Sequence, residues 1–426
     1  MFFFNGAVFA NWVARVPAIK DAIDAGTGTL GVALLGIAVG SLLTMPFAGK
    51  LCERYTSRRV VVATGAAVAV SLASLALAPN TVSLAVLLAL YGGSFGLLDV
   101  AMNVQAVAVV RRVGRPIMPW FHAAFSFGGL VGAGTGGLAA AAGLSPVAHF
   151  ALAGAAAGAL LLAVRRYLLL DQATPATTVP STHSIQDQPL DGPAQCAHLL
   201  PATDPDVVPH PPASHSTASV HRRRRLRRPR IPLLVVGLGA IACCAAIGEG
   251  AMADWSALFL RDVRGLDAGA AALGYAAFSI TMTAGRVGGE AAIRRLGSVG
   301  VLRLGGLAAA SGILLAVVVP SAVAGVVGFG LVGLGMCCAF PLALTTAGES
   351  SNGSGGDEIA TVSVIGYLGF LVGPPLIGLL AEVVELRGAI LAVALPSVGL
   401  ALLAPVVDRA AARARPEAVP EPVPVG

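Results

Sequence analysis

The chain has 426 residues, of which 56% are hydrophobic and only 12% are charged, and its mean hydropathy is +0.81. Soluble domains carry about a quarter charged residues, so this composition excludes a soluble globular protein. The net charge of +6 does not indicate nucleic-acid binding, because the basic residues fall between apolar segments, where lipid headgroups account for them. We expect an integral membrane protein that has the lipid bilayer as its partner and binds no nucleic acid.

Twelve apolar runs are long enough to be membrane-spanning helices, each of which needs about 20 residues. In chain order the expected spans are 1–20, 29–49, 60–79, 82–107, 119–142, 146–164, 231–256, 268–289, 299–319, 322–346, 359–381 and 388–406. Most of the 28 lysines and arginines fall on one side if both termini are cytoplasmic. We therefore predict an all-α, polytopic protein of the inner or plasma membrane with both ends inside the cell.

The segment between the sixth and seventh spans differs from the rest in composition. Residues 167–230 are rich in proline, threonine, aspartate and histidine and end in a run of arginines. Irregularly spaced histidines in such a segment favour a solvated linker over a metal site. The expected domains are a six-helix bundle over 1–166, a disordered cytoplasmic linker over 167–230, a second six-helix bundle over 231–407 and a cytoplasmic tail over 408–426.

The two bundles repeat each other in sequence. Trp12 recurs as Trp255, and Gly128 recurs as Gly369 at nearly the same separation along the chain. Six helices duplicated in the same orientation predict two pseudo-symmetric bundles with a cavity between them at mid-membrane depth.

The loop after the second span carries a motif. Residues 49–59, Gly-Lys-Leu-Cys-Glu-Arg-Tyr-Thr-Ser-Arg-Arg, resemble the major facilitator superfamily signature Gly-x-x-x-Asp-Arg-x-Gly-Arg-Arg, with Thr56 in place of the second glycine. The resemblance implies a cytoplasmic latch formed by Glu53, Arg54 and Arg58. A plain positive-inside loop is the alternative. The equivalent loop after the eighth span has Arg294 where the acid belongs, so no second latch is expected.

Four further runs narrow the resemblance to one branch of that superfamily. Residues 11–19, 96–105, 121–126 and 366–375 look like the MosC-type facilitators, which are similar to fucose and hexose proton symporters. The resemblance covers nearly the whole chain except 167–230. It implies a monomeric secondary transporter of a small polar solute, sugar-like or cyclitol-like, coupled to protons and without a cofactor.

Asp99 in the fourth span is the sharpest site candidate. An ionisable group in mid-membrane has a large free-energy cost and marks a functional site by default. Asn103 lies four residues on and shares its helix face. We expect Asp99 to carry the coupling proton, with a hydrogen-bonded structural role as the alternative.

The other candidates are polar or aromatic residues of the spans. The expected substrate-cavity residues are Asn11, Trp12, Asn103, Glu249 and Tyr367. Arg15 and Asp254 are expected nearer the outer surface, as an extracellular gate pair or as two separately solvated charges. His122 is a lower-ranked candidate for proton release, because a single histidine at a helix end is more often structural.

Other functions receive less support from the sequence. A glycine run over 128–137 resembles the motif of drug–proton antiporters, which leaves a drug or metabolite antiporter as the alternative function. A non-transporting membrane sensor is less favoured, because a folded soluble domain usually accompanies it. We expect no enzymatic activity and no metal site, because we identify neither a Gly-x-Ser-x-Gly nucleophile motif nor a His-Glu-x-x-His metal motif. No phosphate-binding glycine loop is evident either, so ATP-driven transport is disfavoured.

Overall fold

A computed structural model describes residues 1–114, 117–170, 233–349 and 356–414. The predicted linker therefore lies outside the described residues from 171 onward, and the end of the predicted tail does so from 415. The helices up to residue 170, here the first half, are α1 (Phe2–Val13), α2 (Val16–Ala22), α3 (Thr27–Tyr55), α4 (Ser57–Leu75), α5 (Thr81–Val113), α6 (Met118–Ala141), α7 (Pro146–Val164) and the 3-10 helix η1 (Arg165–Tyr167). Those from residue 233, the second half, are α8 (Leu233–Asp262), α9 (Ala268–Ala271), α10 (Leu273–Val318), α11 (Ala322–Met336), α12 (Ala339–Glu349), α13 (Gly356–Leu391), α14 (Ala394–Leu403) and α15 (Pro405–Ala414).

The all-α fold is confirmed, and no strand occurs in the described ranges. Within them, 9 helices are long and apolar enough to cross a membrane. The other predicted spans correspond to one shorter helix and to two long helices that are broken within their length. The first span is the shorter α1, α10 is two helices joined where Gly297 leaves the helical region, and α13 breaks at Glu385 before α14 continues the last span. Together these account for the twelve predicted spans.

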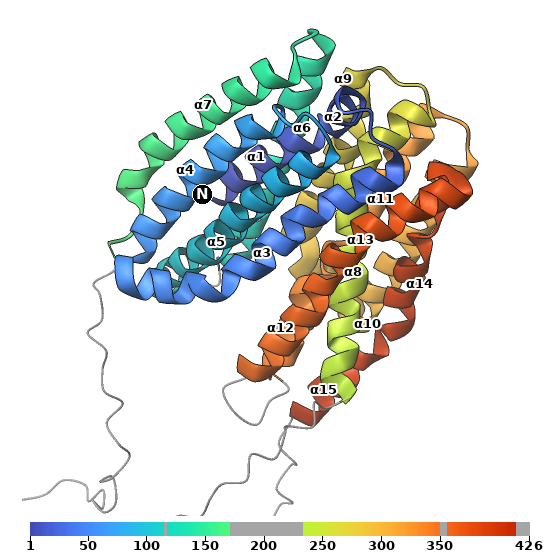
Figure 1. The fold of residues 1–426 in the computed structure, drawn as a ribbon. Helices are drawn as coiled ribbons and strands as arrows, with labels where there is room; N and C mark the ends of the chain where they lie inside the picture. Colours follow the sequence, from blue (N-terminus) through green and yellow to red (C-terminus); the bar gives the residue numbers. More distant parts are fainter. Residues whose placement is uncertain (115–116, 171–232, 350–355, 415–426) are drawn as a thin grey trace, which may run out of the picture. The chain divides into compact units, whose positions relative to one another are not determined.

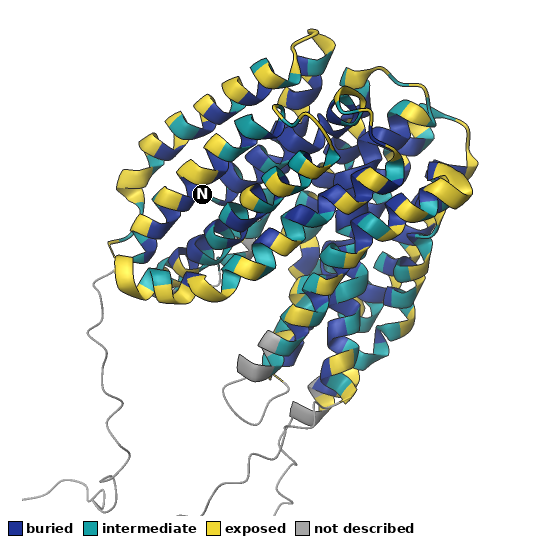
Figure 2. Ribbon diagram, in the orientation of Figure 1, coloured by how far each residue is buried: buried dark blue, intermediate teal, exposed yellow. Residues whose placement is uncertain are grey.

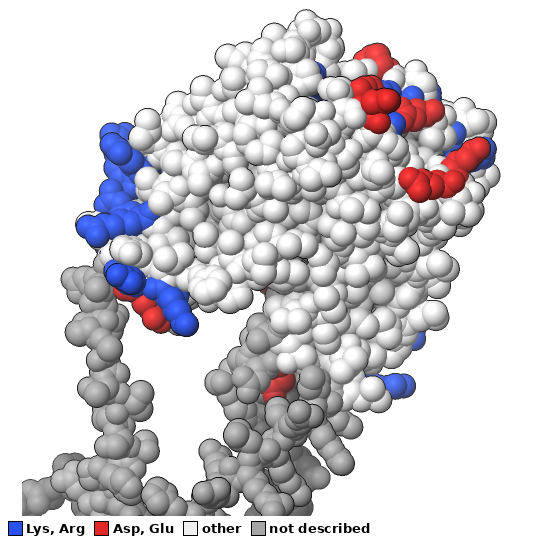
Figure 3. All heavy atoms as spheres, viewed as in Figure 1, with Lys and Arg blue, Asp and Glu red and all other residues white. Residues whose placement is uncertain are grey.

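Large apolar side chains cover the outside of the bundles. Leu43, Val70 and Leu138 are 66%, 71% and 72% exposed, although all three lie within helices. Figure 2 shows exposed and buried residues alternating along the outer helices. Figure 3 shows the charged side chains of this face gathered at the helix ends, with an almost uncharged band between them. Such a band is the surface that lipid tails contact.

Glycines let the first helix of each half approach its partner helix closely. A Cβ on Gly128 of α6 would lie 2.1 Å from the carbonyl oxygen of Phe3 in α1. A Cβ on Gly369 of α13 would lie 2.6 Å from the carbonyl oxygen of Cys243 in α8. The sequence repeat is thus also a packing repeat, and Gly128 of the antiporter-like run serves close helix packing.

The loop that joins α3 to α4 has a counterpart at the bend of α10. Thr56 has φ 78° and ψ 143°, and Gly297 has φ 70° and ψ 165°. Both residues occupy the glycine position of the predicted signature in their own half. Threonine at this position adopts a backbone conformation that glycine favours.

The two halves meet closely at one end, here called the closed end. Figure 1 shows their helices converging there and diverging toward the opposite end. A Cβ on Gly31 of α3 would lie 2.9 Å from the carbonyl oxygen of Pro374 in α13, and one on Gly137 of α6 would lie 2.9 Å from that of Gly269 in α9. An ion pair between Asp21 and Arg261, with oxygen and nitrogen 2.6 Å apart, also joins the halves there.

Candidate functional site

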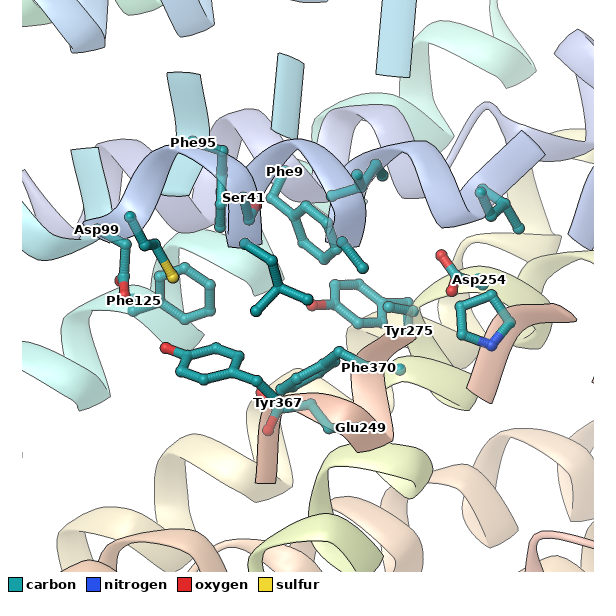
Figure 4. A pocket seen from close by; sticks show the side chains of 18 residues that line it. Phe9, Ser41, Phe95, Asp99, Phe125, Glu249, Asp254, Tyr275, Tyr367 and Phe370 are labelled. Carbon is teal, nitrogen blue, oxygen red and sulfur yellow. The ribbon is translucent and has the colours of Figure 1, made fainter. Parts of the chain in front are cut away.

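A cavity of ≈ 210 Å³ lies between the two halves. Its walls come from α1, α3, α5 and α6 of the first half and from α8, α10 and α13 of the second. Three carboxylates line it, from Asp99, Glu249 and Asp254, together with the hydroxyl-bearing rings of Tyr275 and Tyr367 (Figure 4). The structure therefore brings together four residues predicted from sequence and adds Tyr275.

The Asp99 side chain faces this cavity from α5. Its backbone oxygen accepts a hydrogen bond from the Asn103 side chain at 2.8 Å, but its carboxylate has no hydrogen-bond or ion-pair partner among the described residues. Asn103 is thus engaged with its own helix and does not line the cavity. An unpaired carboxylate on the cavity wall is free to bind a proton or a ligand.

Glu249 belongs to a polar bridge between the halves. Arg286 of α10 lies 3.7 Å from the Glu249 carboxylate, measured from Nη2 to Oε1. The same guanidinium donates to the hydroxyl of Ser126 in α6 at 2.7 Å. Sequence analysis did not select Arg286, although a single arginine within an apolar span is itself the signal.

Asp254 and Arg15 do not form the predicted gate pair in this conformation. Arg15 is 4% exposed and donates to the backbone carbonyl of Leu144. Asp254 is 7% exposed, lines the cavity and has no partner among the described residues. Instead, the closed end is joined by Asp21 with Arg261 and by Glu382, whose carboxylate accepts a hydrogen bond from the Gly28 backbone at 3.1 Å.

Asn11 and Trp12 lie inside the first half and not on the cavity wall. The Asn11 side-chain oxygen is 2.8 Å from His149 Nε2 and accepts a hydrogen bond from the Thr135 hydroxyl at 3.2 Å. Trp12 is fully buried and packs against Phe150, with ring centroids 6.2 Å apart. In this conformation both residues hold α1 against its neighbours.

The remaining candidates lie away from the cavity. Glu53 and Arg54 are exposed at the end of α3, and the Arg54 guanidinium lies 5.3 Å from the centroid of the Tyr55 ring. Neither Glu53 nor Arg58 has an ion pair within the described part of the chain, so the latch stays a prediction. His122 lies edge-on to the Phe2 ring, with centroids 5.5 Å apart.

The expectation that the chain has no Gly-x-Ser-x-Gly motif was wrong. Residues 92–96, Gly-Gly-Ser-Phe-Gly, match the Gly-x-Ser-x-Gly pattern of hydrolase nucleophiles, which sequence analysis overlooked. That pattern requires a strained turn between a strand and a helix. Ser94 instead lies in the middle of α5 and donates to the Leu90 carbonyl at 3.0 Å. The match therefore has no nucleophile geometry.

Comparison with known proteins gives the same fold and a family. Residues 1–357 match the Major Facilitator Superfamily model. The chain is 33% identical over 408 residues to an uncharacterised MFS-type transporter of Yersinia pestis, covering 96% of this chain and 94% of that protein. It is 34% identical over 409 residues to an uncharacterised transporter of Sinorhizobium fredii, covering 96% of each. Membrane protein MosC of Rhizobium meliloti is 30% identical over 390 residues, covering 92% of this chain and 84% of MosC.

Solved structures of low identity share the architecture. A bacterial homologue of the human lysosomal transporter Spinster, inward-facing and occupied, superposes with a TM-score of 0.70 at 12% identity, covering 98% of this chain and 97% of that one. A D-xylose–proton symporter gives 0.69 at 12% identity, covering 95% of each. With its relatives named as membrane proteins and transporters, the chain is a multi-pass membrane transporter and not an enzyme, and it belongs to the Major Facilitator Superfamily.

Proposed function

We propose that this transporter is a secondary active carrier that moves a small polar solute, of sugar or cyclitol size, by alternating access and coupled to protons. The observation that carries the proposal is the unpaired Asp99 carboxylate on the wall of a cavity between the two halves. We further propose that it acts as a monomer in the inner or plasma membrane, with both termini cytoplasmic.

Alternating access is supported by the unequal contacts between the halves. Close backbone contacts, such as that of Gly31 with Pro374, occur at the closed end. The positive-inside rule assigns this end, which holds the loops after the first, seventh and eleventh spans, to the outside. On this assignment the conformation is inward-facing, and transport requires the halves to rock about the cavity so that the closed end opens.

Proton coupling is supported by the surroundings of Asp99. Tyr367 and Glu249 line the same cavity as Asp99. Arg286 does not line the cavity but lies beside the Glu249 carboxylate. His122 lies outside the lining. A carboxylate in such an apolar wall has a different free energy of ionisation when water reaches it than when the cavity is sealed. Protonation of Asp99 can therefore follow the conformational state.

The test is uptake into proteoliposomes under an imposed pH gradient, with a panel of sugars and cyclitols, comparing wild type with Asp99→Asn. We expect the variant to lose gradient-driven accumulation while keeping exchange of solute between the two sides. Asp24→Asn makes the same chemical change on an exposed loop and serves as the matched control. Full gradient-driven accumulation by Asp99→Asn would show that Asp99 does not couple protons.

A drug or metabolite antiporter was the alternative function suggested by the glycine run. Because Gly128 packs α6 against α1, the run has a structural role, and no observation on the cavity favours antiport over symport. The direction of the pH dependence in the same assay separates the two. An inward proton gradient drives uptake by a symporter and efflux by an antiporter.

A further inference from the structure

The charge of the cavity wall is strongly one-sided. Asp99, Glu249 and Asp254 line it, and its lining within the described residues includes no lysine, arginine or histidine. Arg286, which lies outside the lining, offsets Glu249 from 3.7 Å. Two carboxylates thus remain without a counter-charge, one at each end of the pocket in Figure 4.

Asp254 is the more enclosed of these two carboxylates. Its side chain is directed into the pocket beside the Tyr275 ring (Figure 4), and the residue is 7% exposed. It makes no hydrogen bond or ion pair with any described residue. A buried carboxylate without a partner has a free-energy cost that a bound cation would offset. The unpartnered group therefore points to a ligand of positive charge.

The rings around the cavity are suited to the same kind of ligand. Phe9, Phe95 and Phe125 line it from the first half, and Tyr275, Tyr367 and Phe370 line it from the second. An organic cation within about 6 Å of an aromatic ring centroid is attracted by the electrons of the ring face. Rings on both walls would enclose such a cation from two sides.

Neutral hydrogen-bonding groups are scarce on the wall by comparison. The lining has no asparagine, glutamine or threonine in the described ranges. The Ser41 hydroxyl already donates to the Gly92 carbonyl at 2.7 Å, which leaves the Tyr275 and Tyr367 hydroxyls as the other neutral polar groups on the wall. A neutral polyol would therefore find its hydrogen-bond partners chiefly in the carboxylates and the two tyrosine hydroxyls, whereas a cation would also neutralise the unpaired negative charge.

From these observations we infer that the substrate is a small organic cation, whose ammonium group pairs with Asp254 against the Tyr275 ring. The inference rests on the proposed function, because it assumes that the substrate occupies this cavity. It narrows the polar solute to one with a single positive charge and a body that fits ≈ 210 Å³.

Binding to the purified full-length protein tests the inference without requiring transport. Two pairs of probes differ in charge and little in shape: choline with 3,3-dimethylbutan-1-ol, and glucosamine with glucose. We expect the cation of at least one pair to bind at least tenfold more tightly than its neutral partner. Asp254→Asn should abolish this preference, Asp254→Glu should restore part of it, and Asp24→Asn should leave it unchanged. Melting temperatures identify any variant that fails to fold.

The outcomes separate the two proposals. Equal binding of both members in both pairs, or an undiminished cation preference in folded Asp254→Asn, would overturn the inference. Gradient-driven uptake of a neutral sugar by the same protein would then leave the proposed function intact. Conversely, a cation preference that depends on Asp254, without any gradient-driven uptake, would support the inference and contradict proton coupling.

Discussion

The carboxylate of Glu382 in α13 accepts a hydrogen bond from the backbone N–H of Gly28, at 3.1 Å, in the first turn of α3. A carboxylate of the second half therefore caps a helix N-terminus of the first half. The first N–H groups of a helix lack partners within it, and the helix dipole favours a negative charge beside them. Because a Cβ on Gly28 would lie 2.2 Å from the Glu382 carboxylate oxygen, the approach requires glycine.

Glu382→Gln is expected to loosen the closed end. The cap joins the two halves, so it stabilises only the conformation in which that end is closed. Charges at helix N-termini contribute about 0.3 to 1 kcal/mol, which corresponds to a shift of about two- to fivefold in the population of open molecules. Spin-label distances between α3 and α13 measure that population. Glu385→Gln alters an exposed carboxylate three residues further along the chain, at the break in α13, and should leave the distances unchanged.

Gly28→Ala gives an independent check on the same contact. The added methyl group should displace the Glu382 carboxylate and open the closed end to a similar extent. In the double variant with Glu382→Gln the two effects should not add, because both substitutions remove the same interaction. Additive effects would mean that the two residues act separately.

Thr56→Gly is expected to stabilise the protein. With φ 78° and ψ 143°, Thr56 occupies a region that costs a residue with a side chain about 1 to 3 kcal/mol. Its hydroxyl accepts a hydrogen bond from the Arg59 backbone at 3.4 Å, and replacing such a helix cap by glycine costs only a few tenths of a kcal/mol. We expect a net gain of about 1 kcal/mol, seen as a higher melting temperature in detergent. Thr64→Gly, within α4, should lower it.

Residues whose chemistry is unusual in a membrane were the easiest candidates to select from sequence. Asp99 and Glu249 were selected because a carboxylate within a membrane span is costly enough to stand out alone, and both line the cavity. Tyr367, selected from the 366–375 run, lines it too. Asn11 was predicted for the cavity, yet Phe9 lies there instead. Phe9 and Asn11 are two residues apart, so their side chains point to nearly opposite sides of the helix. The sequence does not indicate which side of α1 faces the second half.

Contacts across the two halves were beyond sequence analysis for a different reason. Glu382 and Gly28 lie in opposite halves, 354 residues apart in sequence, and no local pattern in either segment indicates the other. Arg15 and Asp254 were predicted to form a gate only because both were expected at a similar depth near the outer surface of the membrane. In this conformation Arg15 instead binds the Leu144 carbonyl of its own half.

Gly40→Ala is expected to destabilise the first half. A Cβ on Gly40 would lie 1.9 Å from the Ala89 carbonyl oxygen, so α3 and α5 could not keep their present distance. Overpacking of this kind costs about 1 to 3 kcal/mol. Gly49→Ala is the matched control in the same helix, because its Cβ would meet nothing within 4 Å. A melting temperature lowered equally by both variants would contradict this account of α3 packing.

Asn11→Ala is expected to weaken the fold and leave substrate affinity unchanged. The substitution removes the partner of the His149 ring and of the Thr135 hydroxyl, and a buried polar group left without a partner costs about 1 to 3 kcal/mol. The melting temperature should therefore fall. Tyr367→Phe should have the opposite effects, because the Tyr367 side chain lines the cavity. We expect it to change substrate affinity and to leave the melting temperature unchanged. If Asn11→Ala lowers affinity at an unchanged melting temperature, Asn11 contacts substrate in another conformation, as its sequence position first indicated.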